Sequence, residues 1–106
     1  QKQVPHVQVH EDVLDYIMAV VQATRAHPHL TLGVSPRGSI ALHRAAQAAA
    51  LIDGRGFVTP HDVKSLVKPV VAHRIAADGR FGGEAEAVER SEQILDEILT
   101  SIPAPL

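Results

Sequence analysis

The sequence predicts an all-α domain: a small bundle of four to five helices, with at most a minimal two-strand pairing. Apolar residues recur at spacings of three and four in several segments, which is the pattern of amphipathic helices. Two segments open with a hydroxyl residue followed by proline, a strong signal for a helix start. The chain has 106 residues and is 45% hydrophobic but only 3% aromatic. We therefore expect one domain with a closely packed core of Val, Ile, Leu and Ala.

The first helix is predicted from about His10 or Glu11 to about Ala26, after an extended lead-in over residues 1–9. Acidic residues occupy its first turns, where the helix dipole favours negative charge. The segment His27-Pro28-His29 ends it, because a residue before proline avoids the helical conformation. Its apolar positions are Val13, Leu14, Ile17, Met18, Val20 and Val21.

A second helix is predicted from Pro36 to about Ile52 or Asp53, with Gly54 as its stop. Ser35 fits the N-cap and Pro36 fits the first helical position. The helix is apolar nearly all round, which is typical of a central, buried helix. Three of its polar side chains are expected on a shared side: Arg37, Arg44 and Gln47.

A third helix opens at Thr59, with Pro60 in the first position and Asp62 placed to complete a capping box. Pro69 ends or kinks it, and residues 70–75 are predicted to continue as a short helical piece. Residues 78–83 read as a loop.

The last helix covers about Glu84 to Ser101. Its apolar stripe consists of Ile94, Leu95, Ile98, Leu99 and Ile102. Two short apolar segments each precede a capped helix, and they are candidates for the two-strand pairing: residues 30–32 and Phe57-Val58.

Charge and composition narrow the function classes. The net charge is −2, and the chain has no cysteine, no signal-like N-terminus and no apolar run long enough to span a membrane. A cytoplasmic domain without disulfides is expected. Six acidic residues and one basic residue follow position 83, a distribution typical of a solvated helix face. An acidic chain without a basic stripe argues against nucleic acid as a partner.

No complete active site can be assembled from the sequence. Phosphate-loop, serine-elbow and zinc-protease motifs are absent. No metal site is predicted: the pair His27 and His29 and the pair Asp96-Glu97 read as solvated surface groups. His73-Arg74 has two interpretations, an anion contact or hydrogen bonds to carbonyls at a helix end.

Arg37 is the most unusual candidate. It falls at the second helical position, where the positive end of the dipole makes a cation unfavourable by about a few tenths of a kcal/mol. One interpretation is an exposed surface arginine. The other is an arginine placed to meet an anion, which a helix N-terminus also attracts.

An ordered set of segments resembles the C-terminal helical lid of MoxR-type AAA+ ATPases. The resemblance covers about Val9 to Ile75, and a plausible final helix ends at Ile102-Pro103. The segments are Asp15-Tyr16-Ile17, Ala23-Thr24-Arg25, Leu32-Gly33-Val34-Ser35-Pro36-Arg37-Gly38, Ala41-Leu42-His43-Arg44-Ala45-Ala46, Val58-Thr59-Pro60-His61-Asp62-Val63-Lys64 and Val71-Ala72-His73-Arg74-Ile75.

The resemblance implies a nucleotide-sensing role. Arg37 matches the sensor-2 arginine, which contributes to ATP hydrolysis by reaching the phosphates of bound nucleotide. Ser35 and Pro36 would hold it there, Gly38 would keep the approach open, and Thr24-Arg25 would support the loop or an interface. ATP and Mg²⁺ would bind the full-length protein, whereas this chain alone is expected to be non-catalytic and to bind neither tightly.

The resemblance also implies partners and a domain organisation. The partners are an AAA+ core in cis, neighbouring subunits of a ring and a client protein that the sequence does not identify; coupling to them would be chaperone-like. Residues 1–9 would link to the core, 10–103 form the lid and 104–106 a tail. The alternatives are an independent helical protein-interaction module and a DNA-binding helix-turn-helix around Thr59–Ile75, which the acidic balance disfavours.

Overall fold

The computed structural model describes residues 6–77 and 83–105. The predicted all-α class is confirmed. Four helices dominate the described residues, and a 3₁₀ turn, η2, follows the third of them. The elements are α1 (Glu11–Ala26), β1 (Leu30–Leu32), α2 (Pro36–Ile52), α3 (Pro60–Val71), η2 (Ala72–Arg74), β2 (Ala76–Ala77) and α4 (Glu84–Ser101).

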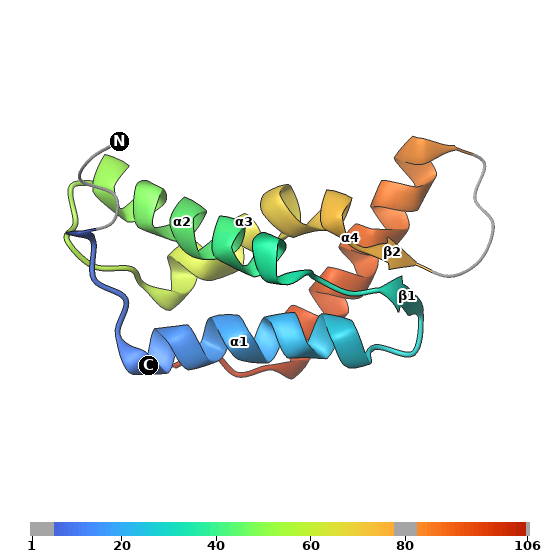
Figure 1. Ribbon diagram of the computed structural model, residues 1–106, viewed down its shortest axis with the longest axis horizontal. Coiled ribbons are helices and arrows are strands. Elements are labelled where there is room, and N and C mark those ends of the chain that lie inside the picture. Colours follow the sequence, from blue (N-terminus) through green and yellow to red (C-terminus); the bar gives the residue numbers. More distant parts are fainter. Residues whose placement is uncertain (1–5, 78–82, 106) are drawn as a thin grey trace.

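The helices pack around one apolar core. Figure 1 shows α1 and α2 as two long helices, with α3 beside α2 and α4 crossing obliquely behind them. The small sheet lies at one end of the bundle. Every helix contributes fully buried aliphatic side chains, as the spacing of apolar residues predicts. The largest of them are Ile17, Val20 and Val21 of α1, Leu42 of α2, Val63, Val67 and Val71 of α3, and Ile94 and Leu95 of α4.

The two-strand pairing exists, but the predicted partner of Leu30–Leu32 is wrong. β1 pairs antiparallel with β2, with Leu30 opposite Ala77 and Leu32 opposite Ala76. Phe57 instead forms an isolated parallel bridge with Gln8. After η2 the chain runs back toward β1, so Ala76 and Ala77 form the pairing that was predicted for Phe57-Val58.

Pro69 does not end its helix. α3 continues to Val71 and η2 follows, whereas Ile75 is already extended at φ −123° and ψ 160°. Proline removes one backbone donor and its ring crowds the preceding turn. Here Val67 and Val71 are both fully buried on either side of it, so packing holds the last turn in place.

α2 is not buried all round, contrary to the expectation from its apolar sequence. Ile40 and Ile52 are 60% and 83% exposed, while Leu42, Ala46 and Ala50 form its buried face. The neighbours of α2 cover one side only. On α1, the predicted apolar positions Leu14 and Met18 are likewise exposed at 41% and 37%, and Tyr16 and Thr24 are buried in addition to the aliphatic stripe.

Gln47 does not share a side with Arg37 and Arg44. Both arginines are exposed, whereas Gln47 is only 5% exposed. Gln47 follows Arg44 by three residues, so its side chain points about 60° away from that of Arg44 around the helix axis. This difference is enough to place Gln47 in the core while Arg44 faces solvent. Its amide Nε2 donates to the Val7 carbonyl at 2.8 Å.

Candidate functional site

The N-terminus of α2 has the capped geometry that the sequence predicts. Ser35 is extended at φ −73° and ψ 164°, and its hydroxyl accepts a hydrogen bond from the Gly38 N–H at 3.1 Å. Its carbonyl accepts from the Ser39 N–H at 3.0 Å. Pro36 occupies the first helical position, so Arg37 follows at the second. These two backbone donors are already occupied within the protein, and the Arg37 side chain is exposed.

Thr24 and Arg25 at the end of α1 hold the peptide that precedes this cap. The Thr24 hydroxyl donates to the Val21 carbonyl at 2.6 Å and accepts from the Val34 N–H at 3.0 Å. The Arg25 Nε donates to the Val34 carbonyl at 2.8 Å. Both polar groups of Val34, which is 2% exposed, are therefore satisfied by α1. The expectation that this pair supports the loop is confirmed.

Gly33 permits the close approach between the loop and α1. A Cβ on Gly33 would lie 2.7 Å from the Arg25 Cα and 2.8 Å from its backbone nitrogen. These are main-chain atoms of a helix, which cannot move aside as a flexible side chain would. The segment before α2 is therefore fixed against α1 by backbone contact as well as by hydrogen bonds.

Gly38 performs a related role inside the first turn of α2. A Cβ there would lie 2.9 Å from the Val34 Cγ1 and 3.2 Å from the Arg74 Cδ. The missing side chain thus admits the stem of Arg74, which comes from η2. Among the described residues Arg74 donates no hydrogen bond to a helix-end carbonyl, so that interpretation of its role is not supported.

Arg37 is exposed and makes no ion pair within the described part of the chain. The first turn of α2 contains no acidic residue. A cation beside the positive end of a helix dipole therefore lacks a protein counter-charge here, and an anion from outside would supply one. A guanidinium can donate to phosphate oxygens in a two-pronged arrangement, so the chemistry of this side chain suits a phosphate group.

Of the other candidates from the sequence, His27 and Glu97 meet, and the His27 side chain is only 11% exposed rather than solvated as predicted. Asp96 and Glu97 are exposed; Asp96 contacts the Lys68 ammonium at 3.1 Å and Glu97 lies 3.7 Å from the His27 imidazole. Across residues 6–77 and 83–105, no three His, Cys, Asp or Glu side chains gather as a metal site would require. Within the same residues, no helix combines the length and apolar character needed to cross a membrane.

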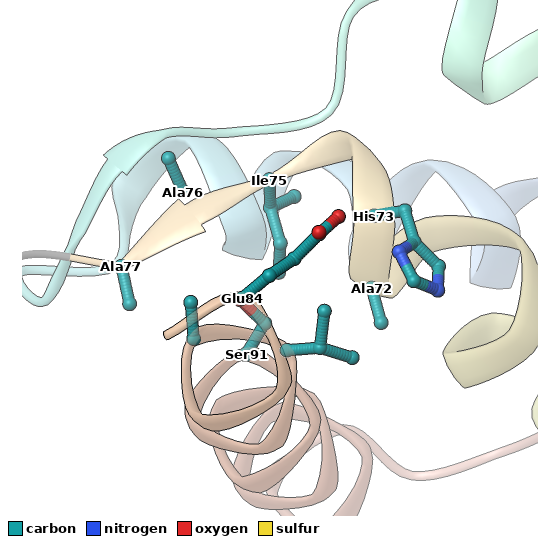
Figure 2. A pocket seen from close by; sticks show the side chains of 9 residues that line it. Ala72, His73, Ile75, Ala76, Ala77, Glu84 and Ser91 are labelled. Carbon is teal, nitrogen blue, oxygen red and sulfur yellow. The ribbon is translucent and has the colours of Figure 1, made fainter. Parts of the chain in front are cut away.

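His73 points to a different place from Arg74. It lines a small pocket of about 230 Å³ between η2, β2 and α4, together with Glu84 and the buried Ser91. Figure 2 shows these side chains among Ala72, Ile75, Ala76 and Ala77. The walls are mostly small apolar groups, so the pocket brings together no set of residues with an evident chemistry.

A second polar cluster joins the start of α3 to the turn that precedes it. The sequence predicted only part of this cluster. The capping box at Thr59 and Asp62 is confirmed. Asp62 also accepts two bonds from the Arg55 guanidinium at 2.7 and 2.8 Å, and one from the Thr59 N–H at 2.8 Å. The Arg55 bond chiefly holds the pKa of the Asp62 carboxyl at about 2, below its usual 3.8.

This cluster also contacts the turn over residues 55–57, to which Gln8 is hydrogen-bonded. Arg55 Nη1 also donates to the Phe57 carbonyl at 3.1 Å. The flanking backbone binds Gln8, whose N–H donates to the Gly56 carbonyl and whose carbonyl accepts from the Val58 N–H, both at 2.9 Å. Gly54 was predicted as the stop of the preceding helix, but nothing in the local sequence pointed to a role for Arg55.

Comparison with known proteins assigns the class. A family model described as the AAA lid domain matches residues 22–98. The chain belongs to this family.

The relatives refine that assignment. The chain is 40% identical to the YeaC protein of Bacillus subtilis over all of its own length and 32% of that protein's. It is 30% identical to chaperone MoxR1 of Mycobacterium tuberculosis, over 92% of this chain and 27% of the relative. With the MoxR protein of Paracoccus denitrificans the identity is 41% over 69% of this chain and 21% of the relative. The resemblance to a MoxR-type lid is therefore confirmed.

A solved structure agrees. The crystal structure of a presumed ATPase from Cytophaga hutchinsonii superposes with a TM-score of 0.81 at 27% identity, covering 99% of this chain and 34% of that one. The chain thus spans about a third or less of the length of these relatives.

Proposed function

We propose that this chain is the nucleotide-sensing lid of a MoxR-type AAA+ ATPase, and that Arg37 is its contact to the terminal phosphates of ATP. The observation that carries the proposal is an exposed arginine on a rigidly held segment, with no counter-charge among the described residues. The matched lid family and the relatives named MoxR and chaperone support it.

The residues around Arg37 fit a phosphate group. Ser35 and Pro36 fix the first turn of α2, and Thr24 and Arg25 fix the peptide before it. The Arg37 side chain needs no reorganisation of the backbone to meet an anion, which is the condition for a strong electrostatic contact. The remaining phosphate contacts and the Mg²⁺ ligands belong to an ATPase core outside this chain.

The proposed mechanism couples nucleotide state to the orientation of the lid. A guanidinium bonded to the γ-phosphate loses that partner when the phosphate leaves. The lid would then be released from the core, as in other switches that a γ-phosphate controls. During transfer, the same arginine can stabilise the charge that develops on the phosphoryl oxygens. The movement would act on neighbouring subunits of a ring and through them on a client protein, in the cytoplasm where ATP is available.

The test is an Arg37→Ala substitution in the full-length protein that carries this chain. ATP hydrolysis should fall by at least about tenfold, in line with the effect of removing a positioned arginine. Arg44→Ala is the matched control, because Arg44 is also an exposed arginine of α2 but lies two turns from the cap. Hydrolysis that is unchanged by Arg37→Ala, with the protein still folded, would refute the role of Arg37.

A second candidate function is an independent protein-interaction module. Its contacts with a partner would include the exposed apolar side chains Ile40 and Ile52 of α2. This module would need no nucleotide. It predicts that Ile40→Asp abolishes binding of a partner while Arg37→Ala has no effect on any activity of the full-length protein.

A further inference from the structure

A second arginine, Arg74, lies against the residue that follows Arg37, although the two arginines are far apart in the sequence. The stem of Arg74 packs against Gly38, the residue that directly follows Arg37, since a Cβ on Gly38 would lie 3.2 Å from the Arg74 Cδ. Arg74 as a whole is exposed. Its apolar stem is therefore in contact with α2, while the charged end remains available to solvent or a ligand.

The small sheet produces this juxtaposition. β1 leads into the segment before α2, and β2 follows η2 after a single residue. Their antiparallel pairing, with a bond from the Thr31 hydroxyl to the Ala76 carbonyl at 3.1 Å, ties the two segments together. Ala72 and Ile75, on either side of the His73-Arg74 pair, are buried at 3% and 8% exposure. The backbone that carries Arg74 is thus held in place independently of its side chain.

Some basic residues of the molecule are neutralised by a carboxylate in the described part of the chain, and Arg37 and Arg74 are not among them. Arg55 is paired with Asp62 and Asp53, and Lys68 with Asp96. Arg37 and Arg74 have no acidic partner among the described residues. Arg25 is close by as well, with its Nε committed to the Val34 carbonyl. Arginines from three elements therefore lie in or against residues 34–38, and none of them forms an ion pair with a described carboxylate.

We infer that Arg74 is a second phosphate-contacting residue, which acts together with Arg37 on a ligand with adjacent phosphate groups. The inference rests on the proposed function and extends it from one cation to two. Two guanidinium groups carried by neighbouring segments suit a nucleoside triphosphate better than a monophosphate, because each can bond the oxygens of a different phosphate. Arg74 would thus contribute to discrimination between ATP and shorter nucleotides.

The test compares Arg74→Met with the unaltered full-length protein. Methionine retains an apolar stem to cover Gly38 and removes only the charge. Affinities for ATP and AMP are measured by competition with a fluorescent nucleotide. Arg74→Met should weaken ATP binding about tenfold, the loss expected for one charge-assisted bond. AMP binding should be unchanged, and Arg74→Lys should restore part of the ATP affinity. Arg44→Met is the matched control and should change neither affinity.

The outcomes separate the two proposals. If Arg37→Ala weakens ATP binding but Arg74→Met behaves like Arg44→Met, the inference about Arg74 is wrong and the proposed function stands. An equal loss of ATP and AMP affinity in Arg74→Met also overturns it, because a general structural effect would act on both ligands. If Arg37→Ala itself leaves ATP binding and hydrolysis unchanged, the proposed function fails and this inference fails with it. Thermal unfolding of each variant confirms that the comparison is made between folded proteins.

Discussion

The pairing of Asp62 with Arg55 should make the stability of the domain depend on acid pH. The Asp62 side chain is 6% exposed and accepts bonds from Arg55 at 2.7 and 2.8 Å and from the Thr59 N–H at 2.8 Å. The Arg55 bond is the main reason why the pKa of Asp62 is about 2 in the folded protein, against an ordinary 3.8. Such a lowering corresponds to about 2 kcal/mol of folding free energy.

The direction of the pH dependence follows from the linkage between proton binding and folding. The folded pKa is lower than the unfolded one, so the contribution is fully present above about pH 4. It is lost as the pH falls from about 4 through about 2, where the folded carboxyl takes up its proton. Below that pH, the Asp62 carboxyl is protonated in both the folded and the unfolded state, and its pairing with Arg55 no longer favours folding.

The assay is urea unfolding of the chain, followed by circular dichroism at pH 7, 4, 3 and 2. Asp62→Asn should unfold more easily at pH 7 by about 2 kcal/mol, and its difference from the unaltered chain should shrink toward pH 2. Asp53→Asn is the control: Asp53 contacts the same Arg55 at 3.1 Å, but its side chain is 70% exposed, so about 0–1 kcal/mol is expected. A difference between Asp62→Asn and the unaltered chain that stays constant from pH 7 to pH 2 would refute the linkage argument.

Two further predictions concern the loop before α2, and the same unfolding assay checks both at pH 7. Thr24→Val removes the buried hydroxyl that accepts from the Val34 N–H and should lower the free energy of unfolding by about 1–3 kcal/mol; a neutral result would mean that another group satisfies this donor. Gly33→Ala places a Cβ 2.7 Å from the Arg25 Cα and should also cost about 1–3 kcal/mol, whereas Gly56→Ala, with open space around its Cβ position, should be far milder. Equal effects of the two alanine substitutions would show that backbone crowding at Gly33 is not the cause.

The helix starts were predictable because their signals are local. Ser35 and Thr59 were assigned as caps from the residues that follow them, and both caps are present. The same local reading gave the wrong partner for β1, since strand pairing depends on where the intervening helices return the chain. Leu30–Leu32 pairs with the two residues after η2 rather than with Phe57-Val58, and no local pattern distinguishes Ala76–Ala77 from a loop.

The candidate site was predictable only in part for the same reason. Arg37 stood out because a cation is unfavourable at the start of a helix. Its neighbour Arg74 could be identified only in three dimensions, through the contact with Gly38. Gln47 gives a further example: periodicity placed it near Arg37 and Arg44, but the packing of the incoming chain turned it inward toward the Val7 carbonyl.

The hydrogen bond between Gln47 and the Val7 carbonyl is a fixed point on α2 that lies far from Arg37. It fixes residue 7 to the helix ten residues beyond Arg37, a separation of roughly 15 Å at 1.5 Å per residue. A rotation of the domain by about 10° around that point would carry the Arg37 backbone through roughly 3 Å, about the length of one hydrogen bond. A small rotation about the Gln47–Val7 contact is therefore sufficient to make or break a contact of Arg37 at the N-terminal end of α2.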